Sequence, residues 1–106
     1  MIQELQGQIE NIYIRNPIEY DYDEPIFQIE IHEYEQGWNA QLLFKANQIL
    51  DILNEFNVQF ANQLSLKKCY LLNDNEKPLS VPIGIKHHED SEYIEVFNDY
   101  FATLWK

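Results

Sequence analysis

A run of acids and tyrosines, IEYDYDEP, occupies residues 18–25 and is the first feature that could carry chemistry. A catalytic carboxylate pair needs apolar surroundings that raise one pKa, and these acids have hydrophilic neighbours instead. Carboxylates interleaved with tyrosines suit the recognition of Arg and Lys, through charge-assisted hydrogen bonds and cation-π contacts. The sequence therefore favours a partner-binding surface over an active site. The predicted residues are Glu19, Tyr20, Asp21, Tyr22, Asp23 and Glu24, with Glu33 and Glu35 as a second group.

The charge around this run strengthens the interpretation. Residues 16–44 contain seven acids and no Lys or Arg. A second acidic zone, with no basic residue between Lys86 and Lys106, contains Glu89, Asp90, Glu92, Glu95 and Asp99. Unneutralised acids cost stability through self-repulsion, which favours a role for them in binding. The alternative is a solubilising loop whose tyrosines pack onto the sheet.

A second candidate for chemistry is the stretch KHHEDSE at residues 86–92, where imidazoles and carboxylates could bind a transition metal. Consecutive side chains on a loop diverge, however, and a dedicated metal site draws its ligands from separate elements. His32 could supply a distant ligand, but nothing in the sequence places it near His87 and His88. We therefore expect a solvated loop and no bound metal.

Other kinds of site have little support in the sequence. Isolated glycines do not form a phosphate-binding loop, and Ser91 is better placed as a helix cap than as a nucleophile. The single cysteine, Cys69, lies in the apolar run CYLL, where a thiol behaves as a small hydrophobic side chain. We expect no catalytic residue and no cofactor, so the protein is predicted not to be an enzyme.

Composition limits the partners. Eighteen Asp and Glu against seven Lys and Arg give a net charge of -11, which disfavours direct binding to nucleic acid or anionic membrane. A length of 106 residues suits a single domain, residues 1–106. The N-terminus lacks a signal-peptide pattern, and no apolar run approaches the roughly 20 residues that span a bilayer. The sequence thus predicts a cytoplasmic protein with a basic protein partner.

Two segments have the apolar spacing of a helix, and they must position the candidate residues. The first is predicted over about residues 45–63, with an apolar stripe at Ile49, Ile52, Leu53, Phe56 and Phe60. The second is predicted from about Ser91 to Leu104, with apolar residues at Tyr93, Val96, Phe97, Tyr100, Phe101 and Leu104.

The remaining segments alternate with a period of two, which is typical of strands. IFQIEIHEY places Phe27, Ile29 and Ile31 on one face, and WNAQLLF follows after a hairpin loop at residues 35–37. Further strands are expected at QIENIYIR, LKKCYLL and VPIGIK, and Pro82 predicts that the last lies at an edge. We therefore expect an α+β fold: an antiparallel sheet of about five strands, in the order β-β-β-α-β-β-α, with two amphipathic helices packed on one face.

In size and acidity, and in the absence of a catalytic motif, the chain is similar in type to many bacterial immunity proteins, without a family motif. The leading hypothesis is a small acidic inhibitor, an immunity protein or antitoxin that occludes the basic active-site cleft of a toxin such as a nuclease. Alternatives are a nucleic-acid mimic that blocks a DNA-binding defence enzyme, of anti-restriction or anti-CRISPR type, and a non-catalytic adaptor subunit. The protein would be a monomer, or a homodimer formed through the sheet edge near Pro82. An enzyme or metal protein using His32, His87 and His88 is the least favoured reading.

Overall fold

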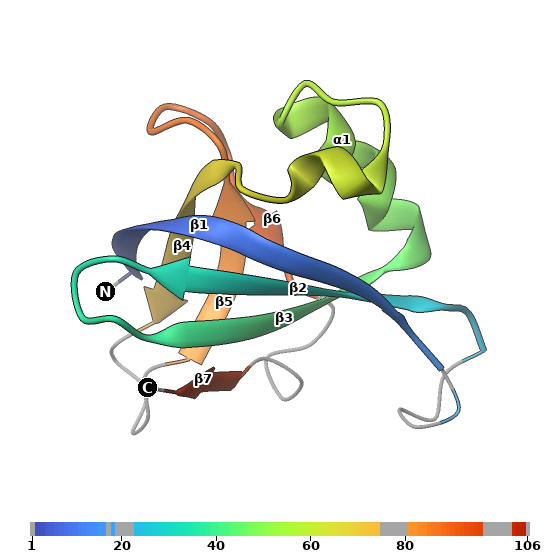
Figure 1. Cartoon of the computed structure of the whole chain (residues 1–106), viewed down its shortest axis with the longest axis horizontal. Coiled ribbons are helices and arrows are strands. Elements are labelled where there is room, and N and C mark those ends of the chain that lie inside the picture. The colour runs from blue at the N-terminus through green and yellow to red at the C-terminus, as the bar shows by residue number, and fades with distance from the viewer. Residues whose placement is uncertain (1, 17, 19–22, 75–80, 97–102, 106) are drawn as a thin grey trace.

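A computed structural model describes residues 2–16, 18, 23–74, 81–96 and 103–105. Its strands form one antiparallel sheet of seven strands in the order β6-β5-β4-β1-β2-β3-β7. Figure 1 shows the sheet with the short helix α1 above it. The strands are β1 (Ile2–Arg15), β2 (Ile26–Glu33), β3 (Asn39–Lys45), β4 (Lys68–Asp74), β5 (Val81–Lys86), β6 (Ile94–Glu95) and β7 (Thr103–Trp105).

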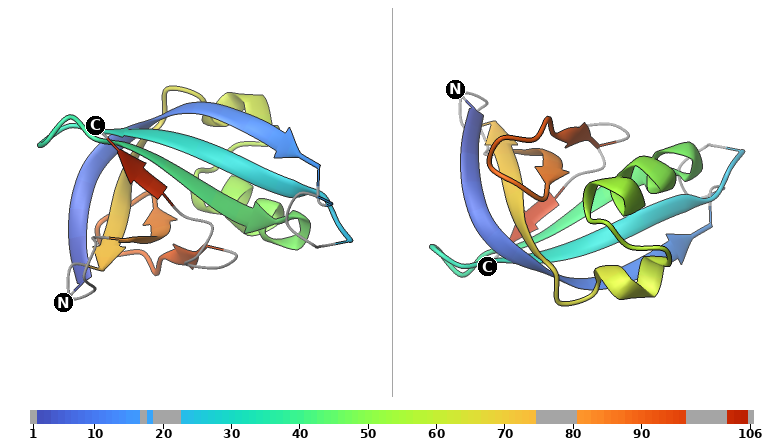
Figure 2. Two further views of the ribbon diagram at one scale, coloured as in Figure 1. Left: turned by 90° about the horizontal axis from the view of Figure 1, so that it is seen from below. Right: turned by 90° about the horizontal axis from the view of Figure 1, so that it is seen from above.

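Strand β1 changes partner along its length, and this bends the sheet. Residues Ile2–Gln8 pair with β4, whereas Gly7–Arg15 pair with β2. The β2 pairing shifts register between Ile9 and Asn11, where a bulge increases the local bend. The sheet therefore curls into a half-barrel, and β7, at one edge, comes close to β5 near the other edge (Figure 2).

The core fills the concave side of this half-barrel. Paired residues of neighbouring strands point to the same face, and the row Ile9, Ile31 and Ala40 is fully buried there. Ile52 of the helix α1 (Ile49–Glu55) and Phe56, the residue directly after the helix, close the core from the other side, since both are buried and belong to the same cluster. The strands also contribute Leu5, Ile29, Leu42, Phe44, Cys69, Leu71 and Ile85.

The predicted helix over residues 45–63 is wrong in its length. The segment forms a 3-10 turn η2 (Ala46–Gln48), the helix α1 of seven residues, and a second 3-10 turn η3 (Ala61–Leu64). Asn57 has a φ of 54°, in the left-handed region that ends a helix and that Asn tolerates better than most residues. The apolar stripe consequently ends at Phe56, and Phe60 is exposed.

The predicted helix from Ser91 to Leu104 is contradicted by strands at both of its ends. Ile94–Glu95 form β6 beside β5, and Thr103–Trp105 form β7 beside β3. The amide of Val96 continues the first pairing by donating to the carbonyl of Ile83 at 3.0 Å. Short apolar runs satisfy both periods, and here the open sheet edges offer hydrogen-bond partners that a helix would leave unpaired. Residues 97–102 lie outside the described part of the chain.

The fold-class prediction is therefore corrected: the described part of the chain is mostly antiparallel sheet with one short α-helix, and within it two amphipathic helices do not pack on one face. The five strands expected from the period-two pattern are present as β1 to β5. The edge position predicted from Pro82 is wrong, because β5 lies between β4 and β6. Pro82 pairs with Asn73 beside a register shift, where a missing amide donor costs the ladder least.

Candidate protein-binding surface

The two groups of predicted binding residues lie at opposite ends of β2. Asp23 and Glu24 directly precede the strand, whereas Glu33 is its last residue and Glu35 lies in the following turn. The strand has eight residues, so its first and last residues are seven steps of about 3.3 Å apart, or roughly 23 Å. A partner that contacts both groups must therefore span the length of β2.

The acids at the hairpin end have different environments. Glu33 is fully buried, and its carboxylate accepts hydrogen bonds from the backbone amides of Glu35 and Gln36 in the turn, the latter at 3.0 Å. Glu35 itself is exposed. Glu33 therefore stabilises the hairpin and has no exposed side chain to offer a partner.

At the loop end, Asp23 and Glu24 are exposed, as the binding prediction requires. Glu19, Tyr20, Asp21 and Tyr22 lie outside the described residues, so their part in the surface stays a prediction. Two large apolar side chains are exposed at the same end, Ile14 at 70% and Ile18 at 80%. The residues described at this end therefore combine acids with apolar surface.

A polar face lies on the convex side of β1, β2 and β3. The Glu30 carboxylate accepts hydrogen bonds from the amides of Asn11, at 3.3 Å, and Gln41, at 3.2 Å. The charge of Glu30 and a hydrogen bond to it raise the pKa of the Tyr13 hydroxyl above its usual range. Next along the face, His32 Nδ1 lies 3.1 Å from the Asn39 side-chain oxygen. These polar side chains are hydrogen-bonded to one another. The face is therefore polar, and these side chains already have hydrogen-bond partners within the molecule.

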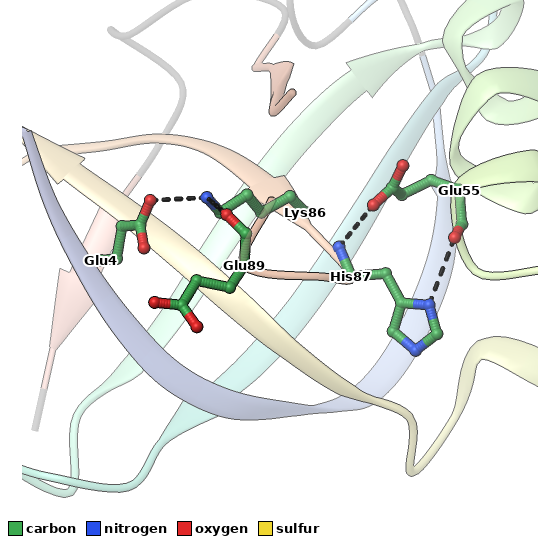
Figure 3. A network of polar contacts seen from close by, with 5 residues as sticks. All are labelled: Glu4, Glu55, Lys86, His87 and Glu89. Atoms are coloured by element: carbon green, nitrogen blue, oxygen red, sulfur yellow. Dashed lines mark hydrogen bonds and ion pairs between the residues drawn. The ribbon is translucent and has the colours of Figure 1, made fainter. Parts of the chain in front are cut away.

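A buried lysine, Lys86, lies directly before the second acidic zone (Figure 3). Lys86 is 5% exposed; its ammonium forms an ion pair with Glu4 of β1 and donates to the backbone carbonyl of Glu89. Its neighbour His87 is tied to the end of α1: its backbone amide donates to the Glu55 carboxylate at 2.8 Å, and its Nδ1 lies 3.2 Å from the Glu55 carbonyl. The connection after β5 is thus attached to both β1 and α1.

A shallow pocket of about 530 Å³ lies beside Lys86. Lys86 is already paired with Glu4, so its charge is balanced. The carboxylates of Glu92 and Glu95 therefore give the pocket a negative charge. Tyr93, between them in sequence, also lines the pocket. Ile2 and Leu72 supply apolar surface. This arrangement can accept a cationic side chain with an aliphatic stem. Glu89 and Asp90 are exposed close by in sequence, and Asp99 lies outside the described residues.

The histidines have structural contacts. The His87 ring packs on Phe56 with centroids 4.7 Å apart and on His88 at 4.1 Å, while His32 lies on β2 with a T-shaped contact to Tyr34. Within the described residues, no group of three or more His, Cys, Asp or Glu could hold a metal ion. Burial raises the pKa of the Cys69 thiol to about 12, so its reactive thiolate is suppressed.

Sequence reasoning missed Ile14 and Ile18. Their only signal was the position of apolar residues beside the acidic run, in IRNPIEYD.

Comparison with known proteins finds no matching family model, no similar curated protein and no similar solved structure. Among the described residues, no helix has the length and apolar character needed to cross a membrane.

Proposed function

We propose that this protein binds a basic protein and inhibits it by covering its cationic cleft, in the manner of an immunity protein or antitoxin that blocks a toxin such as a nuclease. The mechanism is steric and electrostatic, and the protein supplies no chemistry of its own. The proposal places it in the cytoplasm, as a monomer or a homodimer.

The observation that carries the proposal is the exposure of acids on separate loops of one small molecule. Asp23 and Glu24 before β2, Glu35 in the hairpin, and Glu89 after β5 all face solvent. A net charge of -11 attracts a cationic partner and raises its association rate, by roughly 10- to 1000-fold at low salt in favourable cases.

A nucleic-acid mimic receives less support from the shape. Such a mimic needs acids spaced over an elongated surface, whereas the molecule measures 33 × 30 × 23 Å. Glu33, one of the acids that would continue a row along β2, is buried. Inhibition of a basic protein through a local surface is therefore the function we retain.

The test is a pull-down with the tagged protein from a lysate of its source organism, at about 50 mM and 300 mM salt, because salt screens exposed charges. We expect one basic protein, held more strongly at low salt, whose activity falls when the purified inhibitor is added. Recovery of the tagged protein alone at both salt concentrations would contradict the proposal.

Matched charge reversals then locate the surface. Asp23→Lys with Glu24→Lys should slow association with the captured protein, because the acids at the loop end attract it. Glu89→Lys with Asp90→Lys changes the net charge equally at exposed positions in the connection after β5, and should slow it less. Equal slowing by both pairs would mean that only net charge acts and would argue against the loop end as the contact.

A further inference from the structure

The exposed apolar side chains Ile14 and Ile18 lie at the same end of the molecule as the acids Asp23 and Glu24. Arg15, the last residue of β1, pairs with Ile26, the first residue of β2. Asn16 and Ile18 follow that pair on one side and residues 23–25 precede it on the other, so both described segments lie at the same end of the two strands. The backbone amide of Ile18 is held by the Asn16 side chain at 3.0 Å.

Ile14 is exposed because it lies beyond the reach of the core. It belongs to the row Ile14, Phe27 and Phe44, in which Phe44 is fully buried, Phe27 is half-buried and Ile14 is 70% exposed. Only Ile2–Gln8 of β1 pair with β4. Among the described strands, the second half of β1 therefore has β2 as a neighbour on one edge and no strand on the other. Figure 1 shows this end of β1 and β2 on the opposite side of the molecule from the hairpin that joins β2 and β3.

We infer that Ile14 and Ile18 are the apolar anchors of the partner contact, and that the basic partner presents an apolar depression bordered by Lys or Arg. This inference rests on the proposed function and adds to it. A few well-packed, desolvated side chains near the centre of an interface carry most of the binding energy, whereas exposed acids mainly set the association rate.

The surrounding charge identifies the chemistry of the partner. Asp23 and Glu24 are exposed at this end, and residues 16–44 contain no Lys or Arg. Arg15 and Lys45 both pair in register with Ile26 on the opposite, convex face, and each already has an interaction partner. An apolar partner surface without cations would leave the acids desolvated and unpaired, which costs binding energy. A cationic border satisfies them.

The test uses two synthetic peptides of equal charge, one alternating lysine with leucine and the other lysine with serine. Binding is followed through the backbone amide NMR signals at about 50 mM salt, where electrostatic attraction is strong. We expect the lysine–leucine peptide to bind at least about tenfold more tightly, with the largest shifts near Ile14, Ile18 and Asp23. The double variant Ile14→Ser and Ile18→Ser should lower its affinity to that of the lysine–serine peptide.

Leu66→Ser is the matched control, because Leu66 is 67% exposed and its backbone amide donates to the carbonyl of Ile9, five residues along β1 from Ile14. It should leave the affinity unchanged. Equal binding of the two peptides, or an equal loss in Leu66→Ser, would overturn the apolar anchor while leaving the charge-based function intact. Binding of neither peptide would count against the proposed function as well. A dimer in sedimentation that the double variant abolishes would assign the surface to a second copy of this chain and also overturn the inference.

Discussion

The two ends of strand β2 carry the same residue types and differ in what those residues do. At the hairpin end, the Glu33 carboxylate is buried and accepts hydrogen bonds from the turn. Gly7 of β1, which pairs with Glu33, has β2 on one edge and β4 on the other. At the loop end, Asp23 and Glu24 are exposed and β1 lies at the edge of the sheet among the described strands. An acid is structural where the backbone turns back on it and available where the chain leaves the sheet.

The same contrast applies to the apolar residues of β1. Ile9 is fully buried in the core, whereas Ile14, in a row that points to the same face, is 70% exposed. Five residues apart, the two side chains would point to opposite faces of a regular strand, but the bulge between Ile9 and Asn11 brings them to one face. Only the hairpin half of that face is covered. The hairpin end supports the fold, and the loop end is free to bind.

The largest effect should separate these two isoleucines. Ile9→Ala should lower the free energy of unfolding by about 2–5 kcal/mol, because it leaves a cavity in the packed core. Ile14→Ala should change it by no more than about 0.5 kcal/mol, as expected for an exposed side chain. Urea denaturation of both variants measures the difference. Similar losses would mean that the loop end is packed as tightly as the hairpin end.

The two glutamates of the hairpin should differ next. Glu33→Ala should lower the free energy of unfolding by about 1–3 kcal/mol, because the turn amides of Glu35 and Gln36 lose their acceptor. Glu35→Ala, the exposed control, should stay within about 0.5 kcal/mol of the wild type. Thermal and urea unfolding provide the measurement, and a neutral Glu33→Ala would return Glu33 to the list of binding acids.

The thiol of Cys69, which is buried at the hairpin end, should be unreactive at neutral pH. Cys69 pairs with Gly7, and burial raises its pKa from 9.0 to about 12. The raised pKa favours the protonated thiol in the folded state, so this contribution to stability is complete below pH 9 and is lost as the pH rises towards about 12. A thiol reagent at about pH 8 should label Cys69 in urea and not in the native protein. Rapid native labelling would contradict its burial.

The smallest effect concerns Tyr13, at the loop end. Its pKa is raised chiefly by the charge of Glu30, so Glu30→Gln should lower the Tyr13 pKa towards its usual value. Added salt should lower it as well, because Tyr13 is exposed and its interaction is screened. NMR titration of the Tyr13 ring provides the pKa. An unchanged value in Glu30→Gln would remove Glu30 as the cause.

Much of the sheet was predictable from sequence. The alternation around Phe27, Ile29 and Ile31 identified β2, and the turn residues after it identified the hairpin to β3. Both signals are local, since alternation and turn chemistry depend only on neighbouring residues. The acidic character of the loop before β2 was equally visible, and Asp23 and Glu24 are exposed as predicted.

The helices were not predictable in the same way. The stripe from Ile49 to Phe60 satisfies a helical period, but the left-handed Asn57 ends the helix and only the part that meets the core remains. The segment after Ser91 also had a helical spacing, yet it supplies β6 and β7 because the two sheet edges offer backbone partners from distant parts of the chain.

By itself, the sequence determined the charge of the protein, the local alternation of its strands and the position of its acidic runs, because these follow from residue type and near neighbours. Tertiary structure alone decided that Glu33 is buried while Asp23 is exposed, and that Ile9 is covered while Ile14 is not. The reason is the change of partner along β1, since pairing with a strand some 60 residues away determines which half of one continuous strand has neighbours on both sides.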